Sequence, residues 1–207
     1  MLYLHHRESC TQVLGPGLRY ALWVQGCRKR CSGCINPEGW PLDEGGYWMS
    51  VERVMEELGQ MPQLDGITIS GGEPFLQAAA LHRLVARIKA ETRLDIMVYS
   101  GYTLPELRNR HDEEIDGLLD SIDLLIDGEY REEENTNKIY RGSDNQNIHF
   151  LSSKYLPWRR RMLETENRSL EFVCRDNDEL FMVGLPAKGF RRLFMERFYK
   201  GMEEHRE

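Results

Sequence analysis

Three cysteines lie close together near the start of the chain, with three residues between the first two and two between the last pair. They are Cys27, Cys31 and Cys34. Three thiolates can bind three irons of a 4Fe-4S cubane and leave the fourth iron without a protein ligand. An iron with an open position can bind the amino and carboxylate groups of S-adenosylmethionine and pass one electron to its sulfonium. This spacing therefore predicts a cluster that generates a 5′-deoxyadenosyl radical, which abstracts a hydrogen atom.

A structural zinc site is the main alternative for clustered cysteines. Such a site takes four tetrahedral ligands, usually as two Cys-x-x-Cys pairs or with added histidines. No second pair is present, because Cys10 and Cys174 are isolated in the sequence. A disulfide framework is disfavoured because five cysteines are an odd number and no secretory signal is expected. The open cluster is the favoured prediction.

The composition agrees with a cytoplasmic enzyme. The chain has 207 residues, of which 41% are hydrophobic, and this is enough to bury one good core. The formal net charge of −7 argues against a general nucleic-acid binder. Since no apolar run approaches the length of a membrane span, no membrane partner is expected either. Two basic runs, 28–30 and 159–161, are interpreted as solvated surface or docking patches.

The elements that must position the cysteines follow a repeating strand–helix order. Strands are predicted over residues 18–25, 66–70, 95–99 and 122–126. Helices are predicted after Ser50, over 81–88 and over 104–110. Strands that alternate with helices form a parallel sheet with right-handed crossovers. The predicted fold class is α/β, with its chemistry at the carboxyl ends of the strands.

A pair of glycines follows the second of these strands. Gly71 and Gly72 precede Glu73 and Pro74. Glycines allow a close approach of backbone to a ligand, and a carboxylate can accept hydrogen bonds from an ammonium group. Alone, such a tetrapeptide is usually only a turn. One strand–helix unit after the cysteine loop, it is interpreted as the binding site for the methionine end of S-adenosylmethionine.

Several motifs occur in an order that resembles a known family. The cysteine loop and the Gly-Gly-Glu turn are similar to those of the radical S-adenosylmethionine (radical SAM) superfamily. Further segments resemble the activating components of anaerobic ribonucleotide reductases, small radical enzymes that install a glycyl radical on a partner. These segments are residues 15–19, 32–33, 99–102, 126–128 and 140–146. The resemblance runs from about residue 10 to about residue 150.

The resemblance implies a partial parallel (β/α) barrel of the radical SAM type and two cofactors, a 4Fe-4S cluster and S-adenosylmethionine. It implies that the cluster is bound by Cys27, Cys31 and Cys34. It also implies that the methionine amino group is bound by Gly71, Gly72 and Glu73, with Ser100, Asp127 and Arg141 as candidates for ribose and carboxylate contacts. Glu129 departs from the family pattern, because lysine is common at this position.

The chain continues beyond the family pattern. Residues 1–151 are predicted to form the radical SAM core, 152–168 a linker and 169–207 a C-terminal appendage. Two β-rich runs, 170–175 and 179–184, predict a hairpin. Helical spacing of apolar residues predicts a following helix, from Phe190, Leu193, Phe194 and Phe198. We expect this appendage to pack near the open side of the barrel and to help select a macromolecular partner, without being required for the chemistry.

The leading functional hypothesis is a radical SAM oxidoreductase of the glycyl-radical-activating type. Its substrate is expected to be a protein or peptide, with an anaerobic ribonucleotide reductase as one candidate. Because the chain has no flavin or second-cluster signature, a flavodoxin or ferredoxin is the expected reductant. One alternative is a radical SAM maturase that modifies a peptide. Another, from a different class, is a non-catalytic iron–sulfur or zinc-binding adaptor.

Overall fold

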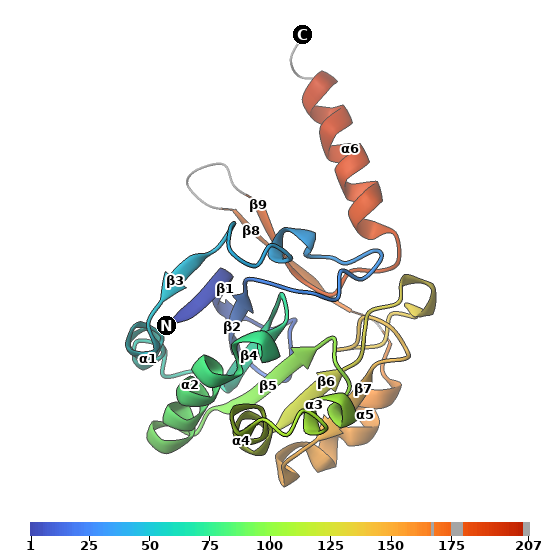
Figure 1. The fold of residues 1–207 in the computed structure, drawn as a ribbon. Helices are drawn as coiled ribbons and strands as arrows, with labels where there is room; N and C mark the ends of the chain where they lie inside the picture. The colour runs from blue at the N-terminus through green and yellow to red at the C-terminus, as the bar shows by residue number, and fades with distance from the viewer. Residues whose placement is uncertain (167, 175–179, 205–207) are drawn as a thin grey trace.

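A seven-stranded mixed sheet forms the centre of the protein (Figure 1). The computed structural model describes residues 1–166, 168–174 and 180–204, with the side chains of 198–204 outside the described part. The sheet order is β3-β1-β2-β4-β5-β6-β7. The strands are β1 (Leu2–Thr11), β2 (Arg19–Val24), β3 (Tyr47–Met49), β4 (Gly66–Gly71), β5 (Asp95–Ser100), β6 (Leu124–Asp127) and β7 (Asn147–Phe150).

The four strands predicted from the sequence are β2, β4, β5 and β6, and they pair in parallel at the centre of the sheet. The edge strands β3 and β7, and β1 beside β3, pair antiparallel with their neighbours. Strands that are covered on both faces read as continuous apolar runs, and every residue of β2 and of β6 is buried. The α/β class is therefore confirmed, and the antiparallel edges are an addition to the predicted parallel sheet.

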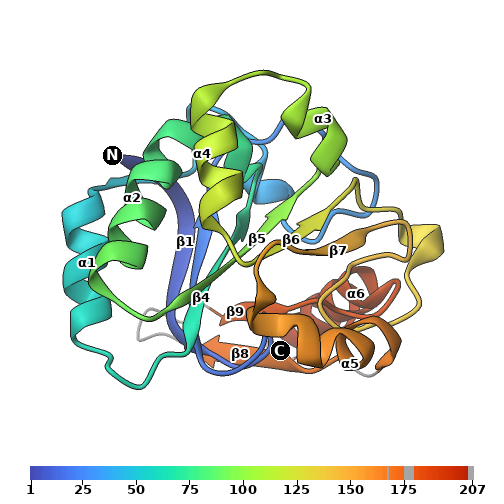
Figure 2. The ribbon, with the colours of Figure 1, turned by 90° about the horizontal axis from the view of Figure 1, so that it is seen from below.

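Helices cover one face of the sheet (Figure 2). They are α1 (Val51–Gly59), α2 (Ala78–Glu91), α3 (Leu104–Arg108) and α4 (Glu113–Ser121). Local signals explain where α1 and α3 begin: the Ser50 hydroxyl accepts a hydrogen bond from the Arg53 amide, and Thr103 and Glu106 form a reciprocal capping box. Short 3₁₀ turns lie at η1 (Pro37–Gly39), η2 (Pro74–Gln77) and η3 (Glu132–Glu134).

The other face of the sheet is covered by segments that follow β7. They are η4 (Ser153–Trp158), α5 (Arg159–Glu164) and a hairpin of β8 (Leu170–Cys174) and β9 (Leu180–Gly184). Tyr155 and Met162 are buried in one apolar cluster with Met97. Val183 is buried in another with Trp23. The stretch 152–168, predicted as a linker, thus contributes buried side chains to this face, while the division into core, linker and appendage stays a prediction.

Hydrogen bonds to a buried ion pair of the sheet join this covering layer to the strands. Arg19 Nη2 lies 2.7 Å from Asp95 Oδ1, and both side chains are at most 1% exposed. Asp95 Oδ2 also accepts hydrogen bonds from Lys154 Nζ at 2.9 Å and from the Tyr155 hydroxyl at 2.5 Å. Burial raises the pKa of Asp95, but the charge of Arg19 and these hydrogen bonds outweigh it and hold the pKa below its ordinary value.

The C-terminal helix α6 (Phe190–Glu204) extends away from the body of the protein (Figure 1). Its first turns are held by aromatic stacking, with ring centroids 5.6 Å apart between Phe172 and Phe194 and 5.7 Å apart between Phe190 and Phe194. The predicted hairpin strands and helix are therefore present, while the turn at 175–179 and the Phe198 side chain lie outside the described residues. Within the described ranges, no helix is long and apolar enough to cross a membrane.

Candidate functional site

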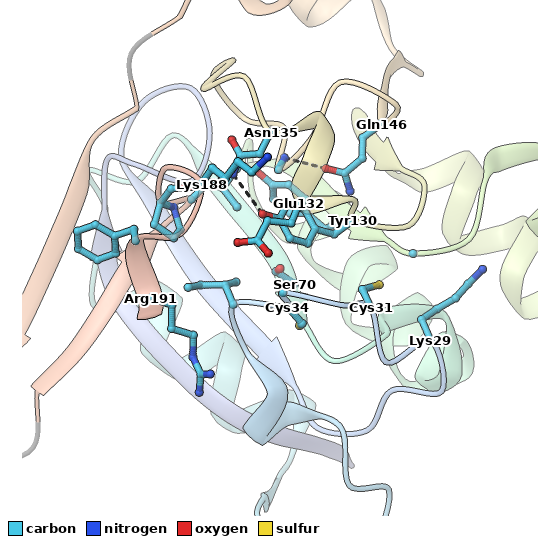
Figure 3. Close-up of a pocket in the computed structure, with 18 of the residues that line it drawn as sticks. Lys29, Cys31, Cys34, Ser70, Tyr130, Glu132, Asn135, Gln146, Lys188 and Arg191 are labelled. Atoms are coloured by element: carbon cyan, nitrogen blue, oxygen red, sulfur yellow. Dashed lines mark hydrogen bonds between the residues drawn. The ribbon is translucent and has the colours of Figure 1, made fainter. Parts of the chain in front are cut away.

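A cavity of about 800 Å³ lies at the carboxyl ends of the parallel strands and brings the predicted motifs together (Figure 3). All three cysteines of the predicted cluster loop line it, as do the glycine turn after β4 and the end of β5. The predicted site residues among its lining are Cys27, Cys31, Cys34, Gly71, Gly72, Glu73 and Ser100. Residues far apart in the sequence meet here because parallel strands end at the same edge of the sheet.

Two backbone hydrogen bonds shape the cysteine loop, one at its start and one within it. The Cys27 amide donates to the Trp40 carbonyl at 3.0 Å, and the Cys34 amide donates to the Cys31 carbonyl at 3.2 Å. Inside the loop, Gly33 has a φ of +73°, a backbone conformation that residues other than glycine rarely adopt. The loop is thus a set of tight turns that presents its thiols toward one cavity.

Burial raises the pKa of each of the three thiols. For Cys31 the value rises to about 11, opposed by a backbone hydrogen bond at Tyr130 and reinforced by the negative charge of Glu129. The exposed Glu129 thus acts through its negative charge on the Cys31 thiol, at the position where the sequence resemblance leads us to expect lysine. Because metals bind thiolates, assembly of a cluster must displace the protons from these thiols.

The three thiols fit a cubane cluster. All five cysteines are free, but Cys10 and Cys174 are exposed, whereas the three loop cysteines are partly buried around one cavity. Among the described residues, no three His, Cys, Asp or Glu side chains converge in the way that a single metal ion requires. In a cubane each thiolate binds a different iron, so three thiols need only surround a shared volume.

The two glycines of the turn after β4 are required by close backbone contact. A Cβ on Gly72 would lie 2.2 Å from the Gly26 carbonyl oxygen, and one on Gly71 would lie 2.4 Å from the Val24 nitrogen. Gly71 also has a φ of +105°. The amides of Gly72 and Glu73 donate to the carbonyls of Val24 and Gly26. The glycines thus seat this turn directly against the start of the cysteine loop.

Glu73 has an organising role that sequence reasoning did not predict. Its side chain is 1% exposed, and burial raises its pKa. Oε1 accepts hydrogen bonds from the Phe75 amide at 3.0 Å and from the Ser100 hydroxyl at 2.9 Å, while Oε2 accepts one from the Gly101 amide at 2.7 Å. A carboxylate has about four acceptor positions. Three are used within the protein, which leaves one on Oε2 for a ligand.

The structure does not bring Asp127 and Arg141 into the lining of the cavity. Asp127 is fully buried and accepts hydrogen bonds from the Leu104 amide and from His149 Nε2. Burial raises the pKa of Asp127, but these hydrogen bonds outweigh it and leave the pKa below its ordinary value. The Arg141 guanidinium donates to the Gln146 carbonyl at 3.2 Å. Both side chains therefore hold neighbouring loops together.

Other residues line the cavity that sequence reasoning missed. One group comes from the irregular stretch after β6, with Tyr130, Glu132, Asn135, Gly142 and Gln146. A second group comes from residues 185–193, 195 and 196, beyond the end of β9. The stretch after β6 has no periodic apolar pattern or metal-ligand spacing. The apolar spacing that begins at Phe190 predicted a helix and not a site, so no sequence signal marked these side chains as site residues.

The central strands are parallel, and the cavity at their carboxyl ends is lined by three thiols and a glycine turn. This arrangement is that of an iron–sulfur enzyme with room for a cosubstrate. A family model described as a 4Fe-4S single cluster domain matches residues 13–149. The anaerobic ribonucleoside-triphosphate reductase-activating protein of Vibrio cholerae serotype O1 is 38% identical over 152 residues, which cover 70% of this chain and 96% of that protein.

The pyruvate formate-lyase-activating enzyme of Staphylococcus aureus strain USA300 is 44% identical over 92 residues, which cover 42% of this chain and 37% of that enzyme. The crystal structure of QueE from Escherichia coli superimposes with a TM-score of 0.41 at 16% identity, covering 49% of this chain and 53% of that one. This chain belongs to the 4Fe-4S single-cluster family that includes the anaerobic ribonucleotide reductase-activating proteins. The family resemblance of its motifs is confirmed, and the chain is a radical SAM enzyme of the activating type.

Proposed function

We propose that this protein abstracts a hydrogen atom from a glycine of a partner protein and so activates it as a glycyl-radical enzyme. The observation that carries the proposal is the single cavity lined by all three cluster cysteines and by the glycine turn after β4. When bound there, the reduced cluster and S-adenosylmethionine supply a 5′-deoxyadenosyl radical. The glycine Cα–H bond then breaks homolytically: the hydrogen atom forms 5′-deoxyadenosine, and the unpaired electron stays on the glycine.

The chain's own residues hold the reacting groups in place. The cluster ligands are Cys27, Cys31 and Cys34. Gly71 and Gly72 keep their turn against the cysteine loop, and the free acceptor position of Glu73 is the proposed contact for the methionine ammonium group. Ser100 also lines the cavity, next to Glu73, and is a proposed ribose or carboxylate contact. For Asp127 and Arg141 the geometry supports a positioning role through the loops that they join.

The four parallel strands support the finer proposal that the sheet is the partial barrel of radical SAM enzymes. The partner that we favour is an anaerobic ribonucleotide reductase, because the relative named for that substrate is matched over 96% of its length. A flavodoxin or ferredoxin is the proposed reductant. We also propose a cytoplasmic location, where five free thiols remain reduced, with no nucleic-acid or membrane partner.

Anaerobic reconstitution with iron and sulfide tests the proposal. The expected product is a brown protein that forms methionine and 5′-deoxyadenosine from S-adenosylmethionine when dithionite is added. With an anaerobic ribonucleotide reductase present, electron paramagnetic resonance should show a glycyl radical on the reductase. A colourless zinc protein without this cleavage would contradict the enzyme assignment. Cleavage without a glycyl radical on the reductase would contradict the proposed partner.

A further inference from the structure

A half-buried arginine from beyond the family match forms part of the cavity wall. The family model ends at residue 149, whereas Arg168 lines the same cavity as the cluster cysteines. Its Nη1 donates hydrogen bonds to the carbonyls of Pro186 at 3.0 Å and Leu185 at 3.3 Å. Its Nη2 donates to Asn135 Oδ1 and, at 3.4 Å, to the Gly142 carbonyl. These hydrogen bonds hold the guanidinium in one position at the wall.

The same contacts place Arg168 relative to the cysteine loop. Asn135 Nδ2 donates a hydrogen bond to the Tyr130 hydroxyl at 3.2 Å, and the two side chains lie next to each other in Figure 3. A backbone hydrogen bond at Tyr130 in turn reaches the Cys31 thiol. Arg168 is therefore connected to a predicted cluster ligand through only two intervening residues.

Two polar atoms at this wall are buried without a partner. Among the described residues, neither Arg168 Nε nor the Tyr99 hydroxyl has a hydrogen-bond partner. Both side chains line the cavity. Burial raises the pKa of Tyr99 and the positive charge of Arg168 opposes this rise, so the two groups act on each other. Because buried polar atoms are nearly always hydrogen-bonded, these two atoms mark a place for a polar group of a ligand.

The charge of Arg168 is also unmatched. In the part of the chain that the structure describes, no carboxylate lies within ion-pair distance of its guanidinium. Burial lowers the pKa of Arg168, and the charge of Asp144 opposes this only from a distance. Asp144 is exposed and lies 3.7 Å from the Arg141 guanidinium instead. A partly desolvated cation without a counter-charge favours the binding of an anion.

The carboxylates that line the cavity do not supply this counter-charge. Glu73 accepts its three hydrogen bonds at the turn after β4. Glu132 accepts one from the Gly189 amide at 3.3 Å, and Glu196 is exposed. An anion beside Arg168 must therefore come from a ligand.

The other cations of the cavity wall are exposed or already engaged. They are Lys29, Lys188, Arg191 and Arg192. Arg191 Nη2 lies 2.6 Å from Glu38 Oε1. Lys29 Nζ lies 4.4 Å from the centre of the Tyr102 ring, and the remaining two side chains are exposed. Arg168 is thus the lining cation that combines burial with a free donor atom.

S-adenosylmethionine has one anionic group, its carboxylate. A carboxylate has about four acceptor positions, so it keeps several after one oxygen binds the open iron. We propose that Arg168 Nε and the Tyr99 hydroxyl donate hydrogen bonds to this carboxylate, with the charge of Arg168 balancing its own. This inference rests on the proposed placement of the cosubstrate in the cavity. It makes a residue of the predicted linker part of the cosubstrate site.

The affinities of two compounds for the reconstituted, unreduced holoenzyme test the proposal, measured by anaerobic calorimetry. One is S-adenosylmethionine, and the other is its decarboxylated form, which keeps the adenosine, the sulfonium and the amine. The ratio of the two affinities is decisive, because general damage to the wall weakens both compounds alike, whereas a lost carboxylate contact weakens only the first. Arg168→Gln should lower this ratio by about tenfold, and Tyr99→Phe by about fivefold.

Tyr99→Phe keeps the test decisive if Arg168→Gln does not fold, because the Tyr99 hydroxyl has no partner among the described residues and its removal breaks no internal hydrogen bond. The matched control is Tyr140→Phe, since this phenol packs in the same apolar cluster as Tyr99 but does not line the cavity. It should leave the ratio unchanged.

The inference is overturned if folded Arg168→Gln or Tyr99→Phe protein keeps the wild-type ratio, or if Tyr140→Phe lowers the ratio as far as Tyr99→Phe does. Failure of the wild-type holoenzyme to bind either compound would overturn the proposed cosubstrate site together with this inference. A missing glycyl radical on the reductase, with the expected ratios, would count against the proposed function alone.

Discussion

The hydroxyl of Ser100 donates a hydrogen bond of 2.9 Å to Oε1 of Glu73, and this bond joins the end of β5 to the turn after β4. The motif pattern assigns both residues to the cosubstrate. Their contact shows that Glu73 also ties together two of the loops that form the cavity. Changes at Glu73 should therefore alter the stability of the protein before any ligand is added.

Replacement Glu73→Ala is expected to lower the free energy of unfolding of the apoprotein by about 3 kcal/mol, because three buried donors lose their acceptor. It should also weaken S-adenosylmethionine binding to the reconstituted protein by about tenfold or more. Urea unfolding and calorimetry measure the two effects. Glu56→Ala, at an exposed carboxylate, is the control. An unchanged unfolding midpoint for Glu73→Ala would show that the internal hydrogen bonds contribute nothing.

Replacement Gly72→Ala should displace the cysteine loop, because the added Cβ would lie 2.2 Å from the Gly26 carbonyl oxygen. We expect a lower cluster content after reconstitution, measured as iron per protein and as charge-transfer absorbance. Gly59→Ala is the matched control: nothing lies within 4 Å of the added Cβ, so stability should be unchanged or higher by up to about 1 kcal/mol. Full cluster content in Gly72→Ala would refute this role.

The three loop cysteines should act as one unit. Replacing Cys27, Cys31 or Cys34 by Ala is expected to abolish both the charge-transfer absorbance and the cleavage of S-adenosylmethionine, since each thiolate is the only protein ligand of its iron. Cys10→Ala and Cys174→Ala should leave both signals intact, because these thiols are exposed and do not line the cavity. A complete cluster in the Cys31→Ala protein would contradict the assignment.

The buried carboxylate of Asp95 should make stability depend on pH. Its folded pKa is held below the ordinary value, so its stabilising effect is present above about pH 4 and is lost as the pH falls through the folded pKa. Asp95→Asn should cost about 3–5 kcal/mol at pH 7, because Arg19 loses its charge partner. The difference between wild type and variant should shrink below about pH 4.

Urea unfolding of the reduced apoprotein, followed by circular dichroism between pH 7 and pH 3, measures this difference. Asp43→Asn, at an exposed position, is the control and should show almost no difference at any pH. A gap between wild type and Asp95→Asn that stays constant from pH 7 to pH 3 would refute the linkage.

Two truncations should distinguish the residues that cover the sheet from residues 185–196, most of which line the cavity. A chain that ends at residue 153 loses the buried side chains of Tyr155, Met162 and Val183, and so uncovers one face of the sheet. It is expected to aggregate or to lose its cooperative melting transition. A chain that ends at residue 184 keeps those side chains and should melt cooperatively. Equal melting of the shorter chain and the full chain would show that this face needs no cover.

The sequence by itself predicted the chemistry and determined the centre of the fold. The spacing of Cys27, Cys31 and Cys34 predicts a ligand set within a single loop. The apolar runs of β2, β4, β5 and β6 specify strands that are buried on both faces. These signals are local, because cluster ligation by one loop and strand formation both depend on residues that are neighbours in the chain.

Only the tertiary structure decided how the cavity is bounded and how the second face of the sheet is covered. The ion pair between Arg191 and Glu38 joins residues 153 positions apart, and Tyr155 bonds to Asp95 across 60 positions. The three hydrogen bonds that Glu73 accepts also depend on which strand ends lie side by side. Contacts of this kind leave no periodic mark in the sequence, because each is set by the packing of whole elements against the sheet and not by the residues beside it in the chain.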